Sequence, residues 1–271
     1  MRISPDETRL VLDRGDAQTG LRDVWTVQLS SGIFTRVTFG PGNSVGPEWS
    51  PNGKEVAFGS DRRISGLYDV YRKAADRGDE ELLLASNDQW KIPQQWLRDG
   101  SILLEFFGSG GVPNMFYRLP TSGERKPVLL FRGNKEDFSE DAPIVSSDER
   151  CAAYESDESG RMEVYVATFP MFQQKRRVSE NGGGVPLWRK DGKELFYVTL
   201  DGKFMSVDVK CEARLETRVP RVLFQTPFRL YLHHTIVYCV TENGNKFVLS
   251  EPVDSNKSLT VVLNWTAGLK H

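Results

Sequence analysis

The chain has 271 residues, 39% of them hydrophobic, and its 35 basic and 37 acidic residues leave a formal net charge of −2. This balance argues against a surface built for nucleic acid or anionic membranes, and the absence of an apolar run of 18 residues excludes a direct membrane insertion by this chain. The first residues enter a repeat at once, so no signal peptide is expected in them.

A short turn motif recurs six times along the chain. Its turn residue is Asp or Asn, and the residue after it is Gly or Glu. The six turn residues are 43 to 52 residues apart and are Asp6, Asn52, Asp99, Asp148, Asp191 and Asn243. A period of this size indicates a repeat architecture.

The second unit shows what one repeat contains. Alternating apolar residues predict short strands at 47–50, 55–60, 68–72 and 81–85. The Asn52-Gly53 pair predicts a tight turn with positive φ values between the first two strands. Four short antiparallel strands in one such unit make one blade of a propeller, and the other units follow the same order.

The fold class predicted from the repeats is therefore all-β, a six-bladed β-propeller of four-stranded antiparallel blades. We expect a single domain covering 1–271. The expected blades are 1–45, 46–92, 93–141, 142–184, 185–237 and 238–271. The tryptophans Trp49, Trp96 and Trp188 share one repeat position, which predicts core packing between blades.

The last blade is expected to be incomplete. Its clear strands are three and end at 263–265, while the first unit starts directly at its inner strand. We therefore expect either a blade with three strands or a chain that is part of a longer protein. A seventh blade in the missing part is the weaker alternative.

The pattern Trp-Ser-Pro-Asn-Gly-Lys from Trp49, with Val-Ala-Phe and then Tyr-Asp-Val-Tyr up to Tyr71, resembles the Pro-Asp-type repeat of TolB propellers and related WD-repeat-like bacterial domains. In the C-terminal half, 155–161, 186–197 and 261–270 resemble the propeller tails of bacterial membrane-bound serine/threonine kinases. That resemblance implies an upstream domain and an extracytoplasmic propeller; without it, the expected location is cytoplasmic. The chain has no kinase motifs, so no kinase activity is implied.

Cysteine and histidine offer little chemistry. Cys151, Cys211 and Cys239 are too widely spaced for a zinc pair, and we expect buried free thiols. The histidines are His233, His234 and His271, and no Gly-x-Ser-x-Gly motif accompanies them. The cluster 108–111 is interpreted as a flexible connection. We expect no catalytic residue, no metal and no cofactor.

The remaining candidate site is geometric. In a propeller, the segments that enter each inner strand meet at one mouth of the channel; here they are 43–46, 88–91, 138–141, 181–184 and 233–235. Polar groups beside aromatic rings describe a binding mouth. The predicted ligand-binding residues are Asn43, Asp88, Gln89, Trp90, Phe138, Glu140, Asp141, His233 and His234. Ordinary hydrophilic surface loops are the alternative interpretation.

The sequence thus favours a non-enzymatic propeller that binds a protein, a peptide or a small polar ligand as part of a larger bacterial signalling protein. Two alternatives stay open. One is a propeller hydrolase or lyase with its active site at the channel mouth. The other is the gating propeller of a prolyl-oligopeptidase-like peptidase.

Overall fold

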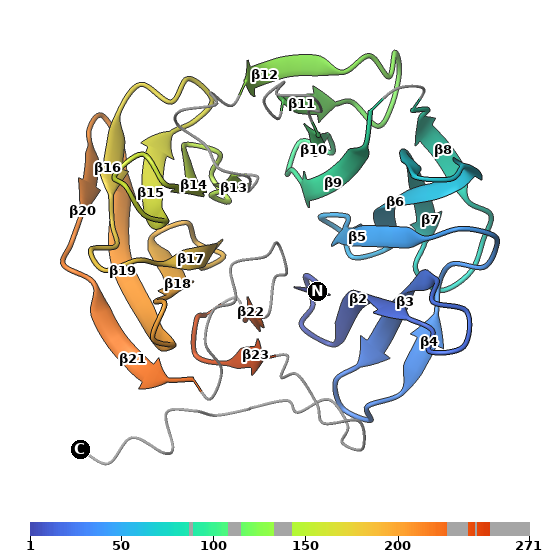
Figure 1. Ribbon diagram of the computed structural model, residues 1–271, viewed down its shortest axis with the longest axis horizontal. Helices are drawn as coiled ribbons and strands as arrows, with labels where there is room; N and C mark the ends of the chain where they lie inside the picture. The colour runs from blue at the N-terminus through green and yellow to red at the C-terminus, as the bar shows by residue number, and fades with distance from the viewer. Residues whose placement is uncertain (87–88, 108–114, 133–142, 227–237, 242, 250–271) are drawn as a thin grey trace. The chain divides into compact units, whose positions relative to one another are not determined.

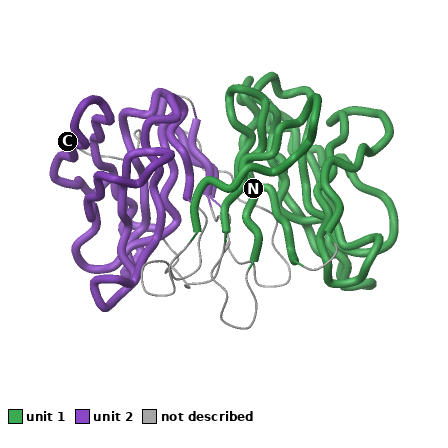
Figure 2. Tube along the Cα trace, turned by 90° about the horizontal axis from the view of Figure 1, so that it is seen from above, with its two compact units in different colours: residues 1–133 green, residues 134–271 purple. Residues whose placement is uncertain are grey.

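The computed structural model describes residues 1–86, 89–107, 115–132, 143–226, 238–241 and 243–249 (Figure 1). These residues form β-strands joined by turns and loops and contain no helix. No helix that could cross a membrane therefore occurs in this part of the chain. The chain divides into two compact units, Met1–Gly133 and Asn134–His271, which Figure 2 shows in different colours.

Unit 1 contains three four-stranded antiparallel blades. The first comprises β1 (Arg2–Ile3), β2 (Arg9–Gly15), β3 (Arg22–Gln28) and β4 (Phe34–Arg36). The second comprises β5 (Ser44–Trp49), β6 (Glu55–Ile64), β7 (Leu67–Ala74) and β8 (Glu81–Leu84). The third comprises β9 (Lys91–Trp96), β10 (Ile102–Phe106), β11 (Met115–Leu119) and β12 (Val128–Arg132).

Unit 2 contains two further blades and a two-stranded sheet. The fourth blade comprises β13 (Ile144–Val145), β14 (Cys151–Ser156), β15 (Glu163–Thr168) and β16 (Lys175–Arg177). The fifth comprises β17 (Gly184–Trp188), β18 (Glu194–Val198), β19 (Lys203–Cys211), β20 (Leu215–Thr217) and β21 (Arg221–Gln225). The sixth repeat contributes β22 (Tyr238–Val240) and β23 (Phe247–Leu249).

The prediction of an all-β propeller with four-stranded antiparallel blades is confirmed: five blades are described, four with four strands and the fifth with five. The fifth blade has a strand that the sequence did not predict, because β20 pairs with the last residues of β19 while β21 pairs with its first residues. The predicted end of the sixth blade at 263–265 lies outside the described residues. The single-domain organisation stays a prediction.

The repeated motif is a turn held by its own side chains. In each of the six turns, the backbone N–H of the residue after the Asp or Asn donates to the carbonyl oxygen three residues earlier, as Gly53 does to Ser50 at 2.8 Å. In four turns a Ser or Thr hydroxyl also donates to that Asp or Asn and accepts the backbone N–H five residues after itself. These hydroxyl residues are Ser4, Ser50, Ser146 and Thr241.

The same turns need one residue with positive φ. Of the Asn52-Gly53 pair, Gly53 alone has it, at 68°, so the expectation of positive values at both positions is wrong. The bond from Gly53 to Ser50 instead forms a turn that is followed by a single left-handed residue. Glycine fills this position in four turns, whereas Glu7 and Glu149 fill it at 57° and 56°. Non-glycine residues adopt this conformation at a cost of roughly 1–2 kcal/mol.

Each repeat tryptophan is buried between two blades, as predicted. Trp49 packs among side chains of the first and second blades, Trp96 among those of the second and third, and Trp188 among those of the fourth and fifth. The Trp49 indole N–H also donates to the Arg2 carbonyl oxygen at 3.3 Å, and the Trp188 indole to the Ile144 carbonyl at 2.8 Å. The tryptophan therefore joins neighbouring blades by packing and, in these two cases, by a hydrogen bond.

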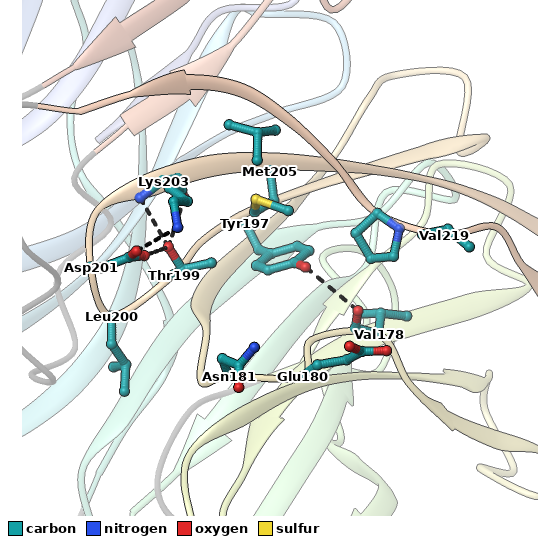
Figure 3. Close-up of a pocket in the computed structure, with 12 residues that line it drawn as sticks. Val178, Glu180, Asn181, Tyr197, Thr199, Leu200, Asp201, Lys203, Met205 and Val219 are labelled. Atoms are coloured by element: carbon teal, nitrogen blue, oxygen red, sulfur yellow. Dashed lines mark hydrogen bonds and ion pairs between the residues drawn. The ribbon is translucent and has the colours of Figure 1, made fainter.

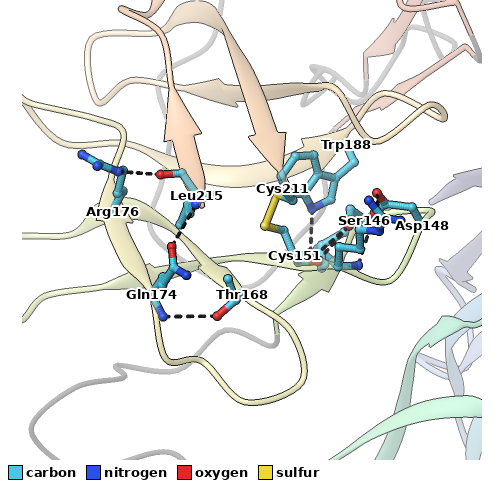
Figure 4. Close-up of a disulfide and its surroundings, with 11 residues drawn as sticks. Ser146, Asp148, Cys151, Thr168, Gln174, Arg176, Trp188, Cys211 and Leu215 are labelled. Carbon is cyan, nitrogen blue, oxygen red and sulfur yellow. Dashed lines mark hydrogen bonds and ion pairs between the residues drawn. A yellow bond between two sulfur atoms is a disulfide. The ribbon is translucent and has the colours of Figure 1, made fainter. Parts of the chain in front are cut away.

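The prediction of free thiols is wrong for two of the three cysteines. Cys151, at the start of β14, and Cys211, at the end of β19, form a disulfide between the fourth and fifth blades (Figure 4). The two residues are 60 positions apart, and only the fold brings their strand ends together. Cys239 is a buried free thiol, as predicted.

Candidate functional site

Three of the nine predicted ligand-binding residues are in the described part of unit 1: Asn43, Gln89 and Trp90. The other six lie outside the described residues, namely Asp88, Phe138, Glu140, Asp141, His233 and His234. Their convergence on one mouth therefore stays a prediction. The three described residues can be examined individually.

Asn43 is engaged by the protein around it. Its side-chain oxygen accepts the Arg22 backbone N–H at 3.0 Å, and its side-chain nitrogen donates to the Asp61 carboxylate at 3.3 Å. The Asn43 backbone N–H donates to the same carboxylate, and the Asp61 N–H donates back to the Asn43 carbonyl at 3.1 Å. Asn43 thus connects the loop before β5 with the start of β3 and with β6.

Trp90 is the exposed member of an aromatic cluster. Its ring meets Tyr68 edge-on at a centroid distance of 5.6 Å and Phe107 at 6.1 Å. The Trp90 carbonyl oxygen accepts the Phe107 backbone N–H at 3.1 Å, so the two loops are fixed to each other. The indole nevertheless remains 47% exposed. We call Tyr68, Trp90 and Phe107 the Trp90 platform.

A buried polar network holds the backbone next to the Trp90 platform. The Lys91 ammonium group donates to the Ser86 hydroxyl at 3.0 Å and to the Gln89 carbonyl oxygen at 3.3 Å, and it lies over the Phe106 ring at 5.0 Å. The Ser86 hydroxyl also donates to the Gln89 carbonyl. Gln89 therefore contributes its backbone to this network, and the segment that carries Trp90 is held in place.

Polar groups flank the platform on one side. Burial raises the pKa of the Tyr68 hydroxyl, and the nearby carboxylates of Asp61 and Asp13 raise it further, against the opposing effect of Arg22. Tyr68 therefore remains a protonated hydrogen-bond donor at neutral pH. The platform combines rigid aromatic surface with a polar edge, which is the composition typical of recognition surfaces.

Unit 2 contains a pocket of about 540 Å³ between the loop after β16 and the strands β18, β19 and β21 (Figure 3). Asn181 is part of its lining and belongs to a segment that the sequence placed at the mouth. The sequence did not predict the remaining lining. The residues from Tyr197 to Lys203 have the pattern of an ordinary β-hairpin. The only sequence signal is two exposed apolar residues, Val219 in the loop before β21 and Val222 in β21.

The described residues offer no metal site. No cluster of three His, Cys, Asp or Glu side chains in them is arranged to hold a metal ion. All three histidines lie outside the described residues, so the catalytic alternatives for the channel mouth stay untested.

No protein-family model matches the chain. Among curated proteins, an uncharacterized protein of Agrobacterium fabrum, Atu1656, is 33% identical over 64 residues, which is 24% of this chain and 21% of that protein. The chain therefore matches about a fifth of that relative's length.

Solved structures show the same fold. A protein assigned as TolB from Agrobacterium tumefaciens matches with a TM-score of 0.61 and 17% identity, covering 80% of this chain and 78% of its own. TolB from Acinetobacter baumannii matches at 0.56 and 17%, covering 81% and 53%. Oligogalacturonate lyase from Vibrio parahaemolyticus matches at 0.56 and 12%, covering 94% and 71%. These neighbours confirm a TolB-like propeller fold.

Proposed function

We propose that this chain is a non-enzymatic, six-bladed propeller that binds a protein, a peptide or a small polar ligand through the Trp90 platform. Six turn motifs support the blade number, since five blades are described and β22 and β23 flank the sixth motif. The platform includes Trp90, one of the predicted mouth residues, together with Tyr68 and Phe107, which the sequence did not single out.

The observation that carries this proposal is a half-exposed indole that is nevertheless held rigidly. Trp90 contacts two aromatic rings, and the neighbouring Gln89 carbonyl oxygen accepts a hydrogen bond from Lys91, yet 47% of the Trp90 surface remains accessible. A rigid aromatic side chain provides a large contact area and loses little conformational entropy on binding. Tryptophan is accordingly enriched among the residues that dominate binding energy.

A random heptapeptide library displayed on phage and selected on the protein tests the proposal. The selected peptides are then titrated against Trp90→Ala and against Phe39→Ala, a matched control because Phe39 is 60% exposed and lies in the same unit. We expect Trp90→Ala to weaken binding about tenfold or more and Phe39→Ala to leave it unchanged. Wild-type affinity in Trp90→Ala, or failure to select any peptide, contradicts the proposal.

The disulfide supports an extracytoplasmic location for the domain. Disulfides persist in oxidising compartments and are rare in the cytosol, so Cys151–Cys211 is expected to form after export. Maleimide labelling of the denatured protein from its native host checks this. One reactive thiol, Cys239, is expected; three reactive thiols place the domain in a reducing compartment.

The sensor role within a larger signalling protein follows from the C-terminal resemblance to kinase tails. The sequence encoded upstream of Met1 in the source genome tests it, because a kinase domain followed by a membrane span is expected there. A peptidase catalytic domain on the same chain would instead favour the gating-propeller alternative.

A further inference from the structure

The pocket in unit 2 has a buried hydroxyl group at its base. Tyr197 is 2% exposed, and its hydroxyl makes one hydrogen bond, to the Val178 carbonyl oxygen, at the long distance of 3.5 Å. No donor among the described residues reaches the lone pairs of this hydroxyl oxygen. A buried hydroxyl with one long bond has capacity left for a further partner, which must be a hydrogen-bond donor.

The two carboxylates that line this pocket, Asp201 and Glu180, differ in whether a basic residue pairs with them. Asp201 is paired with Lys203 at 2.7 Å and accepts the Thr199 hydroxyl, so the Asp201 charge is compensated. The Glu180 carboxylate has no ion-pair or hydrogen-bond partner among the described residues. Figure 3 shows Glu180 beside Val178, on the side toward which the Tyr197 hydroxyl points. The Glu180 charge, which no described residue neutralises, therefore faces the side of the Tyr197 hydroxyl that is available for a further hydrogen bond.

Apolar side chains form the rest of the wall. Val178 and Met205 are inside the pocket, and Leu200, Val219 and Val222 continue the apolar surface outward. Val219 is 89% exposed and Val222 is 55% exposed, although they are adjacent to a pocket of ligand size. An apolar path thus leads to a base that has a hydrogen-bond acceptor and a carboxylate.

We propose that this pocket, which we call the Tyr197 pocket, binds the lysine side chain of a partner protein or peptide. The aliphatic stem lies along Met205 and Val222, and the ammonium group donates to the Tyr197 hydroxyl and the Glu180 carboxylate. This places an apolar stem on an apolar wall and a cation beside an uncompensated anion. The exposed Val219 rim offers surface for the rest of the partner chain.

This site is independent of the Trp90 platform, since it uses other residues in the other unit. Burial raises the pKa of Tyr197 to about 12, and the charges of Glu163 and Glu180 act in the same direction. The hydroxyl therefore remains neutral across the physiological range and is available to an ammonium group.

A series of probes of similar chain length tests the proposal by NMR titration of the full chain: n-hexylamine, 1-hexanol, hexanoate and Nα-acetyl-lysine-N-methylamide. We expect n-hexylamine to bind about fivefold more tightly than 1-hexanol, which corresponds to ~1 kcal/mol for a partly exposed ion pair. Hexanoate is expected to bind most weakly. The lysine derivative is expected to bind at least as tightly as n-hexylamine.

Two variants place the binding in the pocket. Glu180→Gln is expected to abolish the preference for n-hexylamine over 1-hexanol, because it removes the negative charge that pairs with the ammonium group. Since Glu180 is exposed, its replacement is expected to leave the fold intact. Tyr197→Phe is expected to weaken amine binding and to spare 1-hexanol. Glu212→Gln, an exposed carboxylate outside the pocket, is the matched control and retains wild-type affinities.

Equal affinities for the amine and the alcohol overturn the proposal, and so does an amine preference that survives Glu180→Gln. If Tyr197→Phe does not fold, Glu180→Gln decides alone. Binding of n-hexylamine without binding of the lysine derivative overturns the assignment to a protein side chain. None of these results depends on Trp90, so failure here is distinguishable from failure of the platform.

Discussion

The two units attach their blades to one another by different means. In unit 1, ion pairs cross between blades: Arg2 pairs with Glu48 at 2.7 Å, and Arg9 pairs with Asp76 at 2.7 Å. In unit 2, the ion pairs formed between described residues stay within a blade, and a covalent link, the Cys151–Cys211 disulfide, joins the fourth and fifth blades. Neighbouring blades built on the same repeat motif can therefore be joined by ion pairs or by a disulfide.

This difference has a physical consequence. Ion pairs respond to pH and salt, whereas a disulfide responds to reductant and to little else. Unit 1 should therefore be sensitive to pH and unit 2 to redox conditions. Peptide-resolved hydrogen exchange separates the two units and makes each sensitivity measurable.

The largest expected effect is the loss of the disulfide. The double substitution Cys151→Ala/Cys211→Ala is expected to lower the free energy of unfolding by about 4 kcal/mol, since the bridge closes a loop of 60 residues in the unfolded chain. Urea unfolding measures this loss, and hydrogen exchange should place it in unit 2. Cys239→Ala is the control for removal of a buried thiol. An unchanged urea midpoint in the double variant contradicts the prediction.

The next effect concerns pH and unit 1. Burial raises the pKa of Glu48 from 4.5 to about 7, although the Arg2 guanidinium opposes this. Below pH 4.5 both the folded and unfolded states hold the proton. As pH rises from about 4.5 to 7 the unfolded state loses it first, so the free energy of unfolding falls by roughly 3 kcal/mol.

Urea unfolding across this pH window checks the prediction. Glu48→Gln is expected to remove the pH-dependent loss, whereas Glu124→Gln, an exposed carboxylate in the same unit, retains it. If the slope with pH is the same in Glu48→Gln as in the wild type, Glu48 is not the group responsible.

A smaller effect should be shared by both units. Trp49→Phe and Trp188→Phe each remove an indole hydrogen bond to the preceding blade and leave a smaller ring. We expect each to lower the free energy of unfolding by about 1–2 kcal/mol. Trp96→Phe is the reference, because its indole donates to Gly100 within its own turn at 3.0 Å. Hydrogen exchange should increase in β1 or β13 for the first two variants only.

The smallest effect is a stabilisation. Glu7→Gly and Glu149→Gly, one in each unit, should raise the free energy of unfolding by about 1 kcal/mol because glycine relieves the left-handed backbone. Gly53→Ala is the reciprocal control and should lower it by a similar amount. Thermal unfolding measures all three. Destabilisation by both glycine variants would show that the glutamate side chains outweigh the backbone strain.

Much of the fold could be predicted because its signals are local. The repeated Asp or Asn, with Gly or Glu after it, specifies each turn, and the alternation of apolar residues specifies the strands around it. The added strand β20 was missed because Leu215–Thr217 is short and its pairing depends on the unusual length of β19. The disulfide was missed because spacing along the chain does not reveal which strand ends adjoin.

For the candidate site, too, the sequence predicted some residues and missed others. Trp90 was identifiable as an aromatic residue beside an inner strand, and the structure adds that Tyr68 and Phe107 fix it in place. Asn43 was singled out as a polar mouth residue, yet its amide serves the loops of its own unit. The Tyr197 pocket could not be anticipated, because its wall combines residues from three separate segments of the chain.

By itself, the sequence determined the repeat, the turns, the strand order and the position of each tryptophan. These follow from backbone conformation and from the two-residue period of a strand, which act over a few neighbouring residues. Only the tertiary structure decided which charges pair between blades, which cysteines join and which hydroxyl remains available at the base of a pocket. Those outcomes depend on distances between residues that are far apart in the chain.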